Sequence, residues 1–210
     1  MSTYPQRVAE NILPLSVAGT LPEAFREWYF TEAVEDHETA EETCQLCNQE
    51  ELRYHFEIKN RYTNHRLWVG SSCILKFQVQ VFEAGNLLSP ERAKKKLDAL
   101  RRQMRLDSCL RALRELAAAE ENNEILSKAL DYYAKNKYLT PKFAFVVFWR
   151  LSAKKIDHSP SFFKVSLKKD TYKRDLAQMP TERVHKFWSA LSSSQRNLAI
   201  RYGHTEPETT

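Results

Sequence analysis

Two cysteines, a predicted β-hairpin and a third cysteine follow one another in residues 44–77, CQLCNQEELRYHFEIKNRYTNHRLWVGSSCILKF. Cys44 and Cys47 have the C-x2-C spacing that lets two thiolates reach one metal ion across a tight turn. Cys73 follows Val-Gly-Ser-Ser at the start of a predicted helix. This order of knuckle, hairpin and helix-start cysteine predicts a treble-clef-like zinc site.

The hairpin is predicted from the pattern between the cysteines. Residues 52–59, LRYHFEIK, alternate between apolar and polar side chains, as a half-buried strand does. Residues 60–65 are polar and predict a turn, and residues 66–69 predict the second strand. Cys73 then begins a helix that we expect to end near Gly85.

A closed tetrahedral zinc site needs a fourth ligand. His55, His65 and Cys109 are candidates. His55 lies on the first hairpin strand near the knuckle, whereas His65 lies at the hairpin tip, which should point away from the ion. Cys109 lies within a long predicted helix, where a small buried thiol is the commoner role. The residues alone leave these alternatives open.

Four segments of the chain together resemble a little-characterised group of zinc-knuckle proteins from phages, large DNA viruses and mobile elements. They are Glu27-Trp28, Cys44-x2-Cys47, LRYHFEIKN and LWVGSSCILKF, and the resemblance covers residues 22–80 or so. In that group a cysteine often stands where this chain has His55, so the resemblance implies that His55 is the fourth ligand. The group usually has glycine after the knuckle; Asn48 stands there instead and also tolerates the left-handed conformation. The resemblance implies no settled activity.

A site formed by Cys44, Cys47, His55 and Cys73 leaves no position for water, so we expect structural zinc. The start of the chain, MSTYPQRVAENILPL, lacks the charged start and apolar core of a secretory signal. No run in the sequence approaches the roughly 20 apolar residues of a membrane span. We therefore expect a cytoplasmic protein without a membrane partner, whose cysteines are thiols or metal ligands.

The rest of the chain predicts mainly helices. A loose arm over residues 1–20 and a short helix over 22–34 precede the knuckle. After Gly85, helices are expected over 90–118, 122–137, 141–155, 181–190 and 194–202, and residues 159–180 are ambiguous. The predicted fold class is mainly α with a small β-hairpin. Its expected parts are a zinc-knuckle hairpin domain over 1–85, a basic helical domain over 86–204 and a flexible tail over 205–210.

Charge is distributed unevenly around a net value of +5. Residues 1–90 contain 7 Lys/Arg and 13 Asp/Glu, whereas residues 91–210 contain 25 and 14. A basic half suits nucleic acid or an acidic protein surface. Outward-facing arginines and a basic segment with interleaved aromatics suit a phosphate backbone and single-stranded bases. The predicted contacts are Arg101, Arg102, Arg105, Lys164, Lys168, Lys169, Tyr172, Lys173 and Arg174.

The aromatic residues of the predicted helix 141–155 are expected in the core, because aromatic runs on a helix usually pack. They are Phe143, Phe145, Phe148 and Trp149.

The sequence carries no phosphate-binding loop, H-E-x-x-H motif, nucleophile elbow or zinc-deaminase signature, so we expect no enzymatic activity. The leading hypothesis is a non-enzymatic, zinc-stabilised nucleic-acid-binding protein of a phage or mobile element. The alternative is a protein-interaction module, an inhibitor or adaptor of a host complex, whose basic helices dock on an acidic surface. The sequence leaves open the type of nucleic acid and the oligomeric state.

Overall fold

The structure is a computed structural model that describes residues 4–119 and 124–208. The chain divides into two compact units, Met1–Arg105 and Leu106–Thr210. The fold is mainly helical with a small antiparallel sheet, as the sequence predicts. Among the described helices, none is both long enough and apolar enough to cross a membrane.

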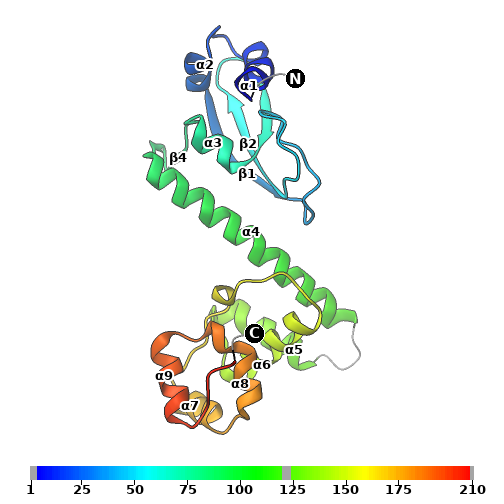
Figure 1. The fold of residues 1–210 in the computed structure, drawn as a ribbon, viewed down its shortest axis with the longest axis vertical. Helices are drawn as coiled ribbons and strands as arrows, with labels where there is room; N and C mark the ends of the chain where they lie inside the picture. The colour runs from blue at the N-terminus through cyan, green and yellow to red at the C-terminus, as the bar shows by residue number, and fades with distance from the viewer. Residues whose placement is uncertain (1–3, 120–123, 209–210) are drawn as a thin grey trace. The chain divides into compact units, whose positions relative to one another are not determined.

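A three-stranded antiparallel sheet forms the centre of the first unit (Figure 1). Its strands are β1 (Trp28–Asp36), β2 (Tyr54–Asn60) and β3 (Arg66–Val69), in the order β1-β2-β3. The hairpin β2–β3 confirms the prediction from the alternating residues. Phe30, Ile58 and Leu67 are cross-strand neighbours and therefore share one face, which belongs to the core of the unit.

Short helices cover this core. They are α1 (Tyr4–Ile12), a 3-10 turn (Leu13–Leu15), α2 (Leu21–Glu27) and α3 (Ser71–Lys76). Val8 and Ile12 of α1 and Ile74 of α3 pack with the sheet residues. The arm predicted as loose over residues 1–20 thus contains a packed helix in its described part, because its apolar residues recur at helical spacing.

The predicted helix over 22–34 is wrong in its second half. The helix ends at Glu27, and Trp28–Asp36 is strand β1, paired along β2 with a bulge between Phe30 and Val34. Trp28 and Phe30 are buried on the core face. Aromatic and β-branched side chains suit a pleated surface, and pairing with β2 outweighs the helical spacing.

The predicted helix from Cys73 to Gly85 is also too long. It ends at Lys76, and the tiny hairpin β4 (Phe82–Glu83) and β5 (Asn86–Leu87) follows. The two residues between these strands, Ala84 and Gly85, both have positive φ, which is the backbone of a tight hairpin turn. Gly85 therefore lies in a hairpin turn and does not end a helix.

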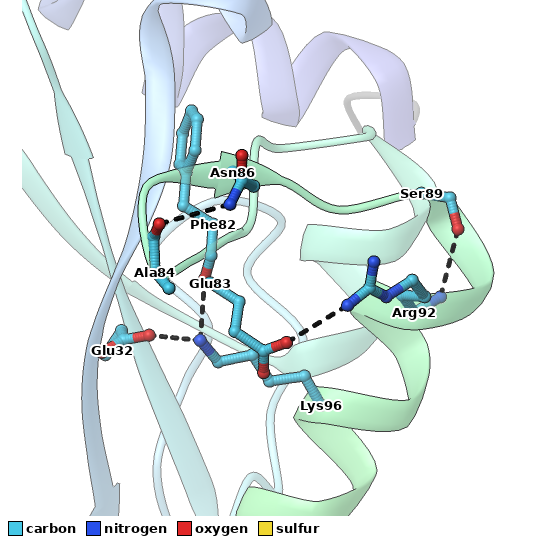
Figure 2. A network of polar contacts seen from close by, with 8 residues as sticks. All are labelled: Glu32, Phe82, Glu83, Ala84, Asn86, Ser89, Arg92 and Lys96. Atoms are coloured by element: carbon cyan, nitrogen blue, oxygen red, sulfur yellow. Dashed lines mark hydrogen bonds and ion pairs between the residues drawn. The ribbon is translucent and has the colours of Figure 1, made fainter.

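The long helix α4 (Pro90–Ala119) confirms the predicted helix 90–118. The boundary between the units lies inside α4 and not near Gly85, because the first turns of α4 belong to the first unit. Figure 2 shows how they are fixed: Lys96 Nζ donates to the Phe82 carbonyl at 2.7 Å and pairs with the Glu32 carboxylate. Ala93 and Leu97 pack in the first core, whereas Cys109 and Leu113 pack in the second.

The second unit is built from helices. They are α5 (Glu124–Asn136), α6 (Pro141–Ala153), α7 (Asp170–Ala177), α8 (Thr181–Phe187) and α9 (Ser193–Arg201), with 3-10 turns at Pro160–Phe162 and Trp188–Ala190. Thr140 caps α6 and Ser192 caps α9 through side-chain hydrogen bonds. Residues 205–208 of the predicted tail form neither helix nor strand, and residues 209–210 lie outside the described part.

Candidate metal centre and nucleic-acid interface

The structure brings the three predicted cysteines together. Cys73 Sγ lies 3.7 Å from Cys44 Sγ and 3.3 Å from Cys47 Sγ, and all three sulfurs lie within 4.8 Å of one another. The three side chains are buried, and no disulfide joins them. Such a buried thiol cluster has the ligand type and proximity that a soft or borderline metal ion requires.

The turn that carries Cys44 and Cys47 is tightly fixed. The Asn48 amide donates to the Cys44 carbonyl at 2.8 Å, and Asn48 adopts a positive φ of 57°. Asn48 thus adopts the left-handed conformation at the position where the zinc-knuckle group usually has glycine. The Gln45 amide donates to the Trp68 carbonyl at 3.0 Å, so the turn is docked on the end of β3.

Ionisation of the sulfurs is interdependent. The hydrogen bond with the Cys73 thiol lowers the pKa of Cys44 to about 5, and a hydrogen bond from the backbone N–H of Gly70 lowers it further. Burial of Cys44 acts against both. The hydrogen bond between Cys44 and Cys73, with burial and the charge at Cys44, raises the pKa of Cys73. One thiolate forms readily, whereas three adjacent thiolates need a cation to offset their repulsion. The residues therefore fit a metal ion.

The structure does not bring His55 into the sulfur group. Because side chains alternate along a strand, His55 lies on the face of β2 opposite Phe56, which belongs to the same core as the cysteines. Its Nδ1 lies 3.1 Å from His37 Nε2, and its buried Nε2 has no hydrogen-bond partner among the described residues. The alternation that predicts the strand thus also explains why His55 is turned away.

The two alternative ligands are not in the group either. His65 is exposed between β2 and β3, and Cys109 is buried in the core of the second unit. Cys109 therefore has the packing role that the sequence favours.

Tyr4 contacts the sulfur group and is absent from the sequence-based site. Its hydroxyl lies 3.9 Å from Cys73 Sγ. Burial and the nearby sulfurs of Cys73 and Cys47 raise the pKa of the Tyr4 hydroxyl. One feature of the sequence could have indicated this contact. Tyr4, Val8 and Ile12 recur at helical spacing, which predicts a packed helix where a loose arm was expected.

The basic segment, which we define as residues 164–174, is anchored to the second core. Leu139 exchanges backbone hydrogen bonds with it: its N–H donates to the Lys164 carbonyl and its carbonyl accepts from Ser166, at 2.8 and 2.9 Å. Val165 and Leu167 are buried, so Lys164 and Lys168 face outward. The extended part of the segment therefore presents its lysines on a fixed backbone.

The predicted contacts in the basic segment differ in how they are partnered. Lys164, Lys168, Lys169 and Arg174 are exposed and form no ion pair within the described chain, whereas Lys173 pairs with Asp170 at 3.0 Å. Tyr172 is half-buried, and its hydroxyl lies 2.9 Å from that of Tyr132. Four side chains thus keep a positive charge without a carboxylate partner, and the Lys169 ammonium lies 5.5 Å from the centroid of the Tyr172 ring. Tyr172 is less open to stacking than the sequence suggests.

The predicted arginines of α4 lie in the first unit. Arg101 and Arg102 are exposed and Arg105 is half-buried, and Arg101 pairs with Asp98 at 3.0 Å. Their contact with nucleic acid stays a prediction.

The prediction that all four aromatic residues of α6 lie in the core is wrong for Trp149. Phe148 is buried, but Trp149 is 41% exposed and stacks on half-buried Phe145, with ring centroids 6.2 Å apart. Arg150 lies over Trp149 and Arg183 over Phe145, at 4.4 and 5.1 Å from the ring centroids. The buried residues of α6 lie on one side of the helix, so Trp149, on another side, is carried outward.

Comparison of the chain with protein-family models, curated proteins and solved structures found no match.

Proposed function

We propose that the protein is a zinc-stabilised nucleic-acid-binding protein that contacts phosphates through its basic segment with little base specificity. Zinc is the proposed ion because buried thiolates suit it, whereas calcium and magnesium prefer oxygen ligands. Its role is structural: it holds the knuckle against β3 and α3. The resemblance over residues 22–80 favours a phage or mobile-element origin, and we propose a binding protein and not an enzyme.

One observation carries the nucleic-acid proposal: four exposed cations without acidic partners stand on an anchored backbone. They are Lys164, Lys168, Lys169 and Arg174. Cations already paired with carboxylates gain little from a phosphate, whereas unpaired ones exchange only water and counterions for it. The second unit as a whole contains 18 Lys/Arg against 12 Asp/Glu, so the surrounding charge also favours a polyanion.

The stacked pair Phe145–Trp149 supports single-stranded nucleic acid in particular. An exposed indole flanked by Arg150 and Arg183 offers a flat surface for a base and cations for the adjacent phosphates. The pair lies in the same unit as the basic segment. We therefore propose single strands as the preferred substrate.

Replacing Lys164, Lys168 and Arg174 together by alanine is expected to weaken binding and to flatten its salt dependence. Each lost phosphate contact on a single strand reduces the slope of log K against log salt by about 0.7, so three losses reduce it by about 2. Fluorescence anisotropy with a labelled single-stranded oligonucleotide over a series of salt concentrations measures the slope.

The matched control removes the same charge from Arg114, Lys135 and Lys186, which are exposed on α4, α5 and α8 of the same unit and likewise form no ion pair among the described residues. The control should keep most of the wild-type slope. Equal slopes in the two triple variants would show that only net charge matters and would reject the basic segment as the site. If wild-type protein binds neither strand form but captures a protein from nuclease-treated lysate, the protein-interaction function replaces this one.

A further inference from the structure

The three sulfurs supply three of the four positions of a tetrahedral zinc site. Among the His, Cys, Asp and Glu side chains that the structure describes, none adds a fourth ligand atom to the group. The remaining position therefore belongs to water or to a side chain of another kind. The Tyr4 hydroxyl lies 3.9 Å from Cys73 Sγ, which places an oxygen beside the sulfur group.

Helix α1 holds Tyr4 in this position. Tyr4, Val8 and Asn11 are spaced by four and three residues and therefore share one face of the helix. Val8 is buried in the first core. The Asn11 amide Nδ2 donates to the Leu46 carbonyl and to Asn48 Oδ1, both at 3.1 Å. The same face of α1 thus contacts the cysteine turn and aims the hydroxyl at the sulfurs.

The Tyr4 ring is also fixed by aromatic and cationic neighbours. It stacks on Phe77 with an interplanar angle of 13°, and Phe77 stacks on Phe25. Lys76 Nζ lies 3.7 Å from the centroid of the Tyr4 ring. Three thiolates and a phenolate around a divalent ion carry excess negative charge, which a nearby ammonium offsets. Lys76 follows Cys73 by three residues and so lies on the same side of α3.

Building on the metal centre proposed above, we propose that the Tyr4 oxygen is the fourth zinc ligand and that zinc binding therefore ties α1 to the cysteine turn. When zinc binds, the phenol O–H bond breaks, an oxygen lone pair bonds to the ion and the proton passes to solvent, without a change of oxidation state. The ion then joins α1, the turn after β1 and the start of α3. Zinc would thereby add a direct link between the N-terminal helix and the cysteine turn to the apolar packing of Val8 and Ile12.

The test titrates metal-free, reduced full-length protein with Zn²⁺ and records the ultraviolet difference absorption of ionised phenol. Wild type should gain one ionised tyrosine per bound ion, and Tyr4→Phe should gain none. Competition with a chelator should show that Tyr4→Phe binds zinc at least about 10-fold more weakly, a loss already seen when outer-shell partners are removed. Tyr62→Phe is the control, because Tyr62 is 66% exposed and should behave as wild type in both measurements.

Hydrogen exchange of α1 gives an independent measurement. Zinc should slow exchange of the α1 amides in wild type and in Tyr62→Phe, and should slow it much less in Tyr4→Phe. Zinc binding without phenol ionisation, or an unchanged ionisation signal in Tyr4→Phe, would overturn the Tyr4 assignment and leave the cysteine centre standing. A wild-type protein without stoichiometric zinc would instead remove the centre and the Tyr4 ligand together.

Discussion

Replacing Cys73 by serine is expected to abolish stoichiometric zinc binding and to unfold the Met1–Arg105 unit, while the Leu106–Thr210 unit stays folded. Cys73 Sγ contacts both other sulfurs, so its loss removes the central ligand of the group. Structural zinc contributes about 10–16 kcal/mol in zinc-finger peptides, which is comparable to the whole stability of a typical domain at about 5–15 kcal/mol. The second unit has a separate core and does not depend on the ion.

Metal analysis of purified protein and hydrogen exchange followed peptide by peptide test this expectation. In Cys73→Ser, amides of β1, β2 and β3 should lose protection, and amides of α5 and α6 should keep it. Cys109→Ser is the matched control, because Cys109 is a buried thiol in the other core; it should cost about 1–3 kcal/mol in the second unit and leave zinc content unchanged. A Cys73→Ser protein with wild-type zinc content and protected strands would contradict the metal centre.

Glu27→Gln is expected to destabilise the first unit by about 2–4 kcal/mol, because a buried carboxylate there accepts several hydrogen bonds. Glu27 is 6% exposed and accepts from the Val17 and Ala18 amides, at 2.9 and 2.7 Å, and from Asn60 Nδ2, at 2.7 Å. It thereby fixes the loop before α2 and the end of β2. A glutamine offers one acceptor oxygen and turns its own N–H2 group toward these donors. Denaturant unfolding measures the change.

The same carboxylate predicts a loss of stability in acid. Burial alone would raise the pKa of Glu27, but the hydrogen bonds from Asn60, Val17 and Ala18 outweigh it and lower the pKa from its usual 4.5. Because the folded-state pKa is the lower one, the stabilisation is present above about pH 4.5 and is lost as the pH falls through the folded value. Glu57, whose pKa Arg66 and Thr31 lower despite burial, acts in the same direction.

The comparison of variants isolates the contribution of Glu27. Glu27→Gln should remove part of the decline of unfolding free energy between pH 5 and pH 2. The rest of the decline should stay, because Glu57 remains. Glu10→Gln removes an exposed carboxylate from α1 and should keep the wild-type decline. If the two variants decline alike, Glu27 is not the group that links folding to pH.

The candidate sites were predictable to different degrees. The spacing of Cys44 and Cys47 and the position of Cys73 before a helix identify three residues that the structure brings together. The lysines of the basic segment were found as charged residues, but their lack of acidic partners is a property of the folded surface. Trp149 was expected inside, since aromatic runs on a helix usually pack, and only the packing of α6 shows which side of the helix is covered.

The sequence by itself determined the elements whose pattern is local: the cysteine turn, the β2–β3 hairpin, and the capped helices α4, α6 and α9. Their hydrogen bonds and caps lie within a few residues, so periodicity and capping residues suffice. Only the tertiary structure decided that Trp28–Asp36 is a strand, that His55 faces away from the sulfurs and that Tyr4 reaches Cys73 across 69 positions. Each of these three features depends on which distant segment of the chain packs against it, and tertiary packing decides that.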